Sequence, residues 1–324
     1  MAAAPELPAR DTEFEVAELR NVDGPAMSAL LDQEAAIWRE TLRWDFSASA
    51  KLVARFLDVQ ALRGYVLLHR GAPVGFSYYV CEERKGLIGD LYVSREFASV
   101  ETEGMLLSAV LGALSQTPPV RRVESQLMML RHAKPPHLPL PQYLRMFERL
   151  FLEIALPASL KPRPDARGIL YEGWTERRQD DAALMIAASY RQHIDSEIND
   201  QYRSAPGARR FLVNIIQYPG CGSFYQPASF VAVDAANGQL RGICLCSLVS
   251  ADAGHVTQVC VGPSMRGHGI GYEMMRRSLE VLTASGCTTA SLTVTAANHS
   301  AVELYLRMGF TQTKAFTAHV WEGF

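Results

Sequence analysis

The sequence predicts a mixed α/β protein in which one fold occurs twice in tandem. Its 324 residues exceed the roughly 100–200 residues of a usual single domain. Residues 157–168, PASLKPRPDARG, place three prolines and four charged side chains between apolar stretches, which is typical of a linker. On both sides of it, strand and helix patterns follow the same order. We therefore expect domains at 1–156 and 169–324, each with a mixed central sheet flanked by helices.

The second half gives the clearer patterns. Helical spacing covers ALMIAASYRQHI, and strand patterns cover SFVAVD, LRGICLCSLVS and HVTQVCV. The glycine-rich loop VGPSMRGHGIGYEMM, residues 261–275, follows at once and leads into an amphipathic helix that ends at Ser285-Gly286. A strand at 290–294, a helix from Ser300 to Arg307 and a strand at 316–321 complete this half.

The first half repeats the order with weaker signals. A hairpin at 65–80, a strand at 87–93, a helix at 102–114 and a strand at 120–130 come in sequence. YLRMF at 143–147 echoes YLRMGF at 305–310, which suggests matching positions. REFASVET stands where the second half has RGHGIG, and its Glu96 and Glu101 would repel an anion. We expect this half not to catalyse but to shape the substrate site or stabilise the protein, with PPHLPLP, 135–141, as a stiff loop or lid.

Composition excludes several classes of protein. With 48% hydrophobic residues, 20% charged residues and a formal charge of −2, the chain is an ordinary globular protein with no electrostatic reason to bind nucleic acid. The six cysteines form no CxxC pair, so we expect neither a metal site nor disulfides. We find no signal-peptide pattern and no apolar run near ~18 residues, so we expect a cytoplasmic protein without a membrane span. The oligomeric state stays open.

The glycine loop favours an anion site. A P-loop would need Lys-Ser/Thr after its glycines, but Tyr272-Glu273 follow Gly271, and the spacing GxGxG does not fit a dinucleotide fingerprint. Bare backbone amides at a helix N-terminus, beside Arg266, would still attract negative charge. The alternative is a structural turn whose glycines only supply positive φ.

Two stretches resemble a known family. VCVGPSMRGHGIG, with Val261, Pro263, Arg266 and the three glycines, resembles the signature of the GNAT superfamily of acyl-CoA N-acyltransferases. LTVTAANHSAVELYLRMGF is similar to a later motif of that family, and maps its asparagine and tyrosine onto Asn298 and Tyr305. The layout is similar to tandem GNAT proteins, mycothiol synthases among them, which pair an active with a decayed copy.

The resemblance implies acetyl-CoA or another acyl-CoA as co-substrate and an amine, on a small molecule or a protein, as acceptor. It implies direct attack in a ternary complex without metal, with Tyr305 as the acid that protonates the leaving thiolate. The alternative for Tyr305 is a core tyrosine on an amphipathic helix. The residues expected to bind the cofactor are Val259, Cys260, Val261, Arg266, Gly267, His268, Gly269, Ile270, Gly271 and Asn298.

The base and the acceptor site are less determined. Strand alternation places residues 255, 257 and 259 on one face, and the family resemblance then suggests His255 as base; the alternative is an exposed histidine at the strand start. Cys260 falls on the opposite face, which argues against a nucleophilic role. SYRQHIDSEINDQYRS, 189–204, is either an acidic acceptor wall or a solvated loop, and YPGCGSFYQP, 218–227, is a candidate second wall. A non-catalytic module that binds acyl-CoA or a protein partner is the alternative function.

Overall fold

The computed structural model describes residues 13–132, 138–162, 166, 168–218, 220 and 222–324. The α-helices are α1 (Gly24–Leu42), α2 (Ser47–Asp58), α3 (Val100–Ser115), α4 (Gln179–Ser189), α5 (Ile194–Ile198), α6 (Ala205–Gln217), α7 (Ile270–Ala284) and α8 (His299–Arg307). The strands are β1 (Phe14–Glu18), β2 (Arg63–His69), β3 (Ala72–Glu82), β4 (Lys85–Val93), β5 (Arg122–Gln126), β6 (Leu144–Ala155), β7 (Ile169–Gly173), β8 (Ser223–Phe224), β9 (Phe230–Asp234), β10 (Leu240–Leu248), β11 (Ala253–Val261), β12 (Thr289–Thr295) and β13 (Thr311–Glu322).

The strands confirm the mixed fold and its repetition. They form one 13-stranded sheet in the order β1-β2-β3-β4-β5-β13-β6-β12-β11-β10-β9-β7, with β8 beside β10. Read from either outer edge inward, both halves run through antiparallel strands to one parallel pair, β4 with β5 and β11 with β12. The chain passes through α3 in the first pair and through α7 in the second.

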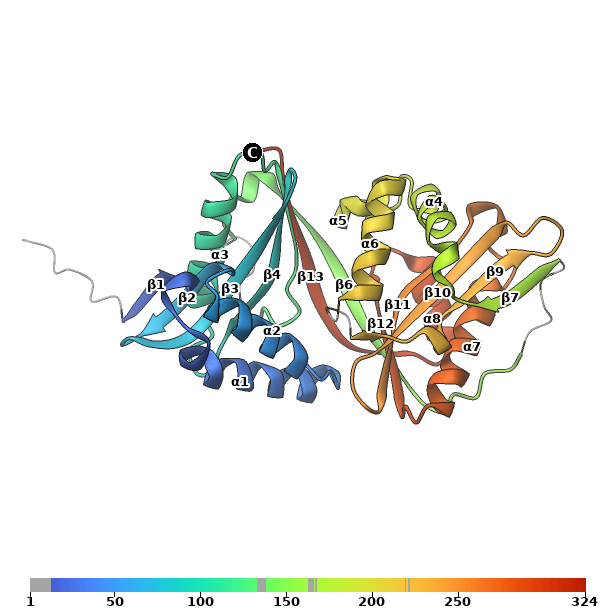
Figure 1. The fold of residues 1–324 in the computed structure, drawn as a ribbon, viewed down its shortest axis with the longest axis horizontal. Coiled ribbons are helices and arrows are strands. Elements are labelled where there is room, and N and C mark those ends of the chain that lie inside the picture. Colours follow the sequence, from blue (N-terminus) through green and yellow to red (C-terminus); the bar gives the residue numbers. More distant parts are fainter. Residues whose placement is uncertain (1–12, 133–137, 163–165, 167, 219, 221) are drawn as a thin grey trace, which may run out of the picture.

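The two halves exchange a strand, which the sequence did not predict. β6 belongs to the first half of the chain but pairs with β12, whereas β13 ends the second half and pairs with β5. β6 and β13 also pair with each other along the middle of the molecule (Figure 1). The proposed boundary at 157–168 falls between β6 and β7 and stays a prediction, and each half of the sheet is completed by a strand of the other half. Residues 163–165 and 167 of that linker lie outside the described residues.

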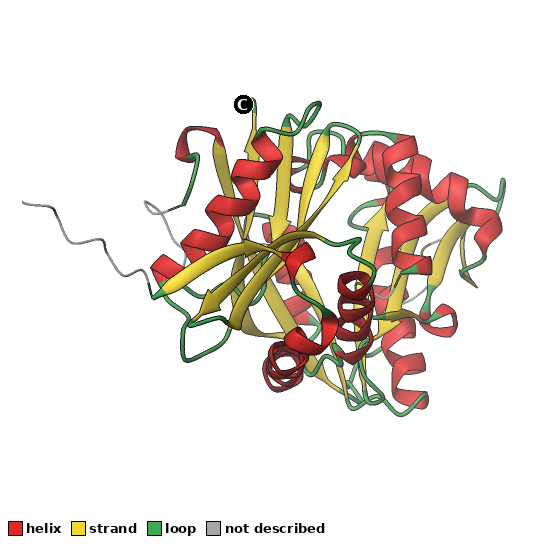
Figure 2. Cartoon of the chain, turned by 60° about the vertical axis from the view of Figure 1, so that its left-hand side comes forward, coloured by secondary structure: helices red, strands yellow, loops and turns green. Residues whose placement is uncertain are grey.

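Helices cover both faces of each half-sheet (Figure 2). In the N-terminal half, α1 and α2 bury one core, which includes Leu31 and Val53, and α3 buries the other, which includes Leu107. In the C-terminal half, α4 and α6 cover one face, and α7 and α8 cover the other. None of the helices in the described ranges is both long and apolar enough to cross a membrane.

The echo between YLRMF and YLRMGF is misleading. Leu144–Phe147 begin strand β6, whereas Tyr305 to Arg307 lie in helix α8. The first half thus lacks a described counterpart of α8 at this place. Residues 135–137 of the PPHLPLP stretch lie outside the described residues; of its remainder, Leu138 is buried in the α3 core, and Trp321 Nε1 donates to Pro139 O at 2.8 Å.

A buried carboxyl pair in the N-terminal half leads to a prediction about stability. Glu34 on α1 is fully buried, its Oε1 accepts from Trp38 Nε1, and its Oε2 has no hydrogen-bond partner among the described residues. Burial, with the nearby Asp90 carboxyl, raises the pKa of Glu34 well above its usual range, and burial raises the pKa of Asp90 to about 6. The folded state thus keeps protons that the unfolded chain releases, so wild-type stability falls as pH rises from about 4 through 6.

We therefore expect Glu34→Gln to raise the free energy of unfolding at pH 7 by about 1 kcal/mol, because the amide is neutral at every pH, whereas Glu34 must take up a proton when the chain folds. The gain should shrink toward pH 4, where the wild-type carboxyl is already protonated. Urea unfolding at both pH values measures it, with Glu40→Gln, an exposed residue on the same helix, as control. An equal gain at both pH values would contradict the ionisation argument.

Candidate functional site

The site opens where two parallel strands separate. β11 and β12 pair only from Ala253↔Thr289 to Val256↔Leu292, so the rest of both strands diverges. Directly beyond this point β11 has a bulge: Leu245 faces Gln258 and Cys246 faces Val256, which leaves Thr257 as the extra residue. Two cavities occupy the divergence, and they share Tyr190, Val259, Asn298 and Ala301.

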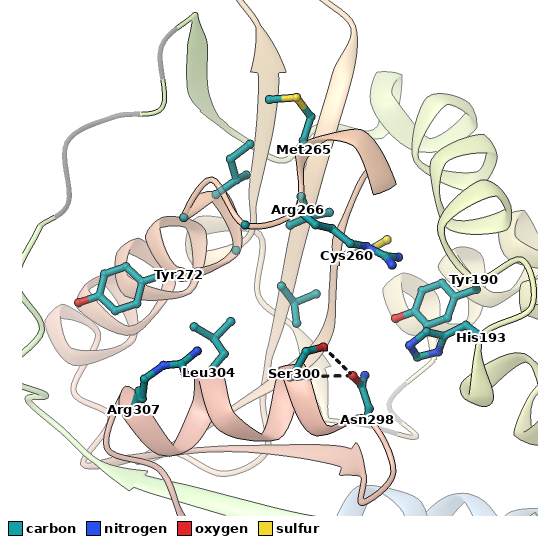
Figure 3. Close-up of a pocket in the computed structure, with 17 residues that line it drawn as sticks. Tyr190, His193, Cys260, Met265, Arg266, Tyr272, Asn298, Ser300, Leu304 and Arg307 are labelled. Atoms are coloured by element: carbon teal, nitrogen blue, oxygen red, sulfur yellow. Dashed lines mark hydrogen bonds between the residues drawn. The ribbon is translucent and has the colours of Figure 1, made fainter.

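The outer cavity has a volume of about 400 Å³ and lies between the glycine loop, β11 and α8 (Figure 3). Of its 17 lining residues, Arg266 and Arg307 are cationic and none is a carboxylate. The lining residues are Tyr190, His193, Val259, Cys260, Val261, Met265, Arg266, Gly267, Gly269, Ile270, Gly271, Tyr272, Asn298, Ser300, Ala301, Leu304 and Arg307. This cavity therefore favours a ligand with an anionic part.

The glycine loop presents free backbone amides to the outer cavity. Gly267 and Gly269 have φ of 81° and 80°, the left-handed region, and α7 begins at Ile270 without a side-chain cap. No N–H group of residues 267–271 donates to another described residue. A Cβ built at Gly267 meets nothing within 4 Å, so the space beside the loop is open. Such amides at a helix N-terminus form an anion site.

The matching loop of the N-terminal half is closed by its own hydrogen bonds. Ser99 caps α3: its Oγ accepts from Thr102 N at 3.1 Å, and Ser99 N donates to Thr102 Oγ1 at 2.9 Å. The amides of Phe97 and Ala98 donate to Ser94 O. The amides of Phe97, Ala98 and Ser99 therefore already have partners, which is consistent with the expectation that this half does not catalyse.

The inner cavity is smaller, about 130 Å³, and polar. Its lining residues are Gln126, Arg149, Tyr190, Asp195, Ile198, Asn199, Tyr202, Val256, Thr257, Gln258, Val259, Leu292, Thr293, Val294, Asn298, Ala301 and Tyr305. Two of these, Gln126 on β5 and Arg149 on the exchanged β6, come from the N-terminal half. The inner cavity thus continues the outer one toward the junction of the halves.

Tyr305 lines the inner cavity next to the shared residue Ala301 on α8. It is 6% exposed, and its ring makes an edge contact with Phe310. Burial raises the pKa of its phenol well above the usual range, so Tyr305 stays protonated at neutral pH. Asn298, the N-cap of α8, lines both cavities, and its Oδ1 accepts from Ala301 N at 3.4 Å.

Asp195 is the carboxylate of the inner cavity. It lies on α5 with its side chain 14% exposed, 3.3 Å from Arg149 Nη1, and it accepts from the Thr295 hydroxyl. Nearby, Gln258 Nε2 donates to Tyr190 Oη at 2.9 Å, and Tyr202 Oη donates to Gln258 Oε1 at 3.3 Å. The inner cavity therefore combines the Asp195–Arg149 ion pair with several neutral hydrogen-bonding groups, which suits a small polar molecule.

His255 does not lie where strand alternation placed it. A Cβ at Gly254 would approach Leu282 of α7 to 2.6 Å, and Val256 packs in the α7 core, so His255 points to the other face. Val259 and Val261 pack against the α7 core, because the bulge at Thr257 shifts the alternation by one residue. The prediction that 255, 257 and 259 share a face is wrong.

The surroundings of His255 argue against a base. The residue is 4% exposed, lines neither cavity, and its ring lies between Trp44 and Phe151. Its Nδ1 is 2.9 Å from Ser291 Oγ, and burial lowers its pKa to about 4. Both earlier interpretations, catalytic base and exposed strand-start histidine, disagree with this position in the core.

The other predicted cofactor residues line the outer cavity, with one exception. His268 does not line it; its Nδ1 is 3.0 Å from Arg266 O, and the side chain is exposed. Cys260 lines the cavity, but it packs in the α4 core and burial raises its thiol pKa to about 11, against a nucleophilic role. YPGCGSFYQP contributes no described residue to either cavity; Pro219 and Cys221 lie outside the described residues.

Sequence reasoning missed several lining residues. Ser300, Ala301, Leu304 and Arg307 follow Asn298 at the spacing of one helix face, so helical periodicity alone was sufficient to find them. Gln126 and Arg149 are different, because only the exchange of β6 and the neighbouring β5 brings them to the site.

Comparison with known proteins agrees with this geometry. Residues 191–310, which include the glycine loop, Asn298 and Tyr305, match the model described as "Acetyltransferase (GNAT) family". A search of the curated proteins found no match.

Solved structures match over the whole length. A GCN5-related N-acetyltransferase from Sphaerobacter thermophilus is similar with a TM-score of 0.66 and 16% identity, over 96% of each chain. A tandem GNAT protein from the clavulanic acid biosynthesis pathway matches with a TM-score of 0.59 and 14% identity, over 96% of this chain and 99% of its own. A glucosamine N-acetyltransferase region of a fungal β-N-acetylglucosaminidase matches with a TM-score of 0.61 and 16% identity, over 95% of this chain and 38% of that one. At these identities the likeness establishes the fold and its tandem layout.

Proposed function

We propose that the chain transfers an acetyl or other acyl group from coenzyme A to an amine, and the match of residues 191–310 to the GNAT acetyltransferase family supports this. The observation that supports this most is the run of unpartnered amides at 267–271, facing a cavity with two arginines and no carboxylate among its lining residues. This arrangement fits the diphosphate of a coenzyme A thioester. The acceptor then belongs in the inner cavity.

Backbone groups of β11 would hold the rest of the thioester. Val259 and Val261 line the outer cavity where β11 has separated from β12, so an extended pantetheine arm can lie along this open strand edge. An amide near Val259 would donate to the thioester oxygen as negative charge develops there, a type of interaction that contributes strongly to catalysis. Arg266, whose Nη2 donates to Ser189 O at 2.9 Å, adds positive charge beside the loop.

Two side chains of the inner cavity are assigned roles in proton transfer. Tyr305, held protonated by burial, would give its proton to the departing thiolate. Asp195 replaces His255 in our proposal: its carboxylate would bind and orient the acceptor as an ammonium ion, which would pass one proton to water before the neutral amine attacks. Direct attack then needs no covalent enzyme intermediate, in agreement with the buried Cys260 thiol.

Asp195→Asn tests the second role. We expect the acceptor KM to rise by about tenfold, or ~1.4 kcal/mol, because the amide keeps the shape but loses the charge that attracts an ammonium ion. The dissociation constant of acetyl-CoA should stay within about twofold. Glu197→Gln is the control, since Glu197 lies on the same helix and pairs with Arg145 outside the cavity. Equal changes in both variants would argue against a specific role of Asp195.

A binding module without catalysis is the second candidate, favoured if the inner cavity accepts no amine. Calorimetric titration with acetyl-CoA, combined with thiol detection of released CoA over a library of amines, amino acids, amino sugars and peptides, separates the two. Binding with amine-dependent CoA release supports the transferase. Binding without release for any amine supports the module, and absence of binding contradicts both.

A further inference from the structure

One wall of the inner cavity belongs to the C-terminal half but is held by the N-terminal half. We call residues 194–203 the acceptor wall; it consists of α5 and the 3-10 turn η4 (Asp200–Arg203), and Asp195, Ile198, Asn199 and Tyr202 line the inner cavity. A helix of five residues is too short to be stable alone, so contacts with the rest of the protein must fix its position.

Three buried charged side chains of the N-terminal half supply such contacts. Lys85 on β4 and Arg122 and Glu124 on β5, here called the clamp, have side chains only 7%, 6% and 8% exposed. They are joined to one another: Arg122 Nε donates to Glu124 Oε1 at 2.6 Å, and Lys85 Nζ lies 3.5 Å from Glu124 Oε2.

Each member of the clamp contacts the acceptor wall. Lys85 Nζ is 2.5 Å from Asp200 Oδ1, Glu124 Oε1 accepts from the backbone N of Asp200 at 2.9 Å, and Arg122 Nη2 donates to the backbone O of Glu197 at 2.6 Å. Two of these three contacts reach backbone atoms, so they fix the course of the wall as well as one side chain. The bond at Asp200 N directly follows Asn199, which lines the inner cavity.

Buried charges are a costly way to join two surfaces. Taking charges out of water opposes the attraction between them, and well-packed apolar side chains often stabilise as much or more. What such a network does provide is a defined geometry, because each bond has a short distance and a direction. At this place the fixed geometry is that of the inner cavity.

We propose that Lys85, Arg122 and Glu124 are positioning residues for the acceptor, and that the N-terminal half, although it has lost its own anion site, sets the shape of the acceptor cavity through them. This inference rests on the proposed acyl transfer for its kinetic consequence. Its structural consequence, an acceptor wall held by the clamp, is independent of any activity.

The test uses Lys85→Met in the full chain, which keeps the length of the side chain but cannot bond to Asp200. In hydrogen–deuterium exchange, peptides covering 194–203 should exchange at least about tenfold faster, whereas α7 should be unchanged. For an amine that the wild type acetylates, the acceptor KM should rise about tenfold, with kcat and the acetyl-CoA dissociation constant within about twofold. Lys85→Arg should restore much of the loss, because it can again pair with Asp200.

Matched variants make the result specific. Arg95→Met removes another ion pair of the N-terminal half, that with Glu40, and should leave exchange in 194–203 unchanged. If Lys85→Met does not fold, Asp200→Asn serves instead. The Asp200 side chain is 32% exposed, so this variant should increase the exchange rate of peptides in 194–203 and the acceptor KM, each by less than Lys85→Met.

Unchanged exchange in 194–203 in a folded Lys85→Met protein overturns the clamp. Faster exchange with equal effects on acceptor and acetyl-CoA overturns the positioning role. If the wild type acetylates no amine, the proposed function fails, and the exchange measurement alone still decides whether the clamp holds the wall.

Discussion

Gly267→Glu is expected to lower the affinity for acetyl-CoA by about 100-fold or more, ~2.7 kcal/mol, without unfolding the protein. The substitution puts a carboxylate beside the amides of residues 267–271 and into the outer cavity that Gly267 lines. Like charge would then face the diphosphate at the one place where the helix N-terminus attracts it. Calorimetric titration of acetyl-CoA into the variant measures the loss.

The chain offers a matched control for backbone strain. Gly238, in the turn between β9 and β10, has φ of 69°, and a Cβ there also meets nothing within 4 Å. Gly238→Glu therefore imposes the same left-handed strain and the same added charge away from the cavity, and should bind acetyl-CoA normally. If both variants lose affinity alike, strain or lowered stability explains the loss, and the proposed diphosphate site is contradicted.

The order of elements could be predicted from the sequence because local patterns determine it. The alternating residues of β11, the helical spacing after Ile270 and the glycines between them each carry their own signal within a few residues. The glycine loop was placed correctly for the same reason: left-handed φ at Gly267 and Gly269 is a local requirement. Most residues that the sequence assigned to the cofactor line the outer cavity, but its residues on α8 beyond the N-cap Asn298 were missed, and the cofactor role stays a prediction.

What failed depended on contacts far apart in sequence or on a single irregular residue. The bulge at Thr257 adds one residue to β11, and a period of two then assigns His255 to the wrong face. YLRMF and YLRMGF share letters, but Leu144–Phe147 pair with β13, and this pairing overrides any helical preference. The inner cavity was predicted only in part. Arg149 reaches it because β6 is exchanged between the halves, and no local sequence pattern indicates that exchange.

Tyr305→Phe should reduce kcat by about 100-fold, within the range of general acid–base catalysis, and leave the dissociation constant of acetyl-CoA unchanged. The phenyl ring keeps the packing against Phe310, so the loss is confined to the hydroxyl. Without it, thiolate must depart unprotonated or take a proton from water. Steady-state kinetics with the amine found in the library screen, together with calorimetry, give both numbers.

Tyr225→Phe is the control for removing a hydroxyl in the same half. Tyr225 Oη lies 2.7 Å from Ser285 Oγ, at the end of α7 remote from the glycine loop, and Tyr225 lines neither cavity. The Tyr225→Phe variant should therefore keep the wild-type kcat. Because burial keeps Tyr305 protonated, the wild-type rate should also show no decline assignable to this phenol up to about pH 9, since its pKa lies well above its usual value near 10. If the Tyr305→Phe enzyme has an unaltered kcat, Tyr305 is not the general acid and acts only as a packing residue of α8.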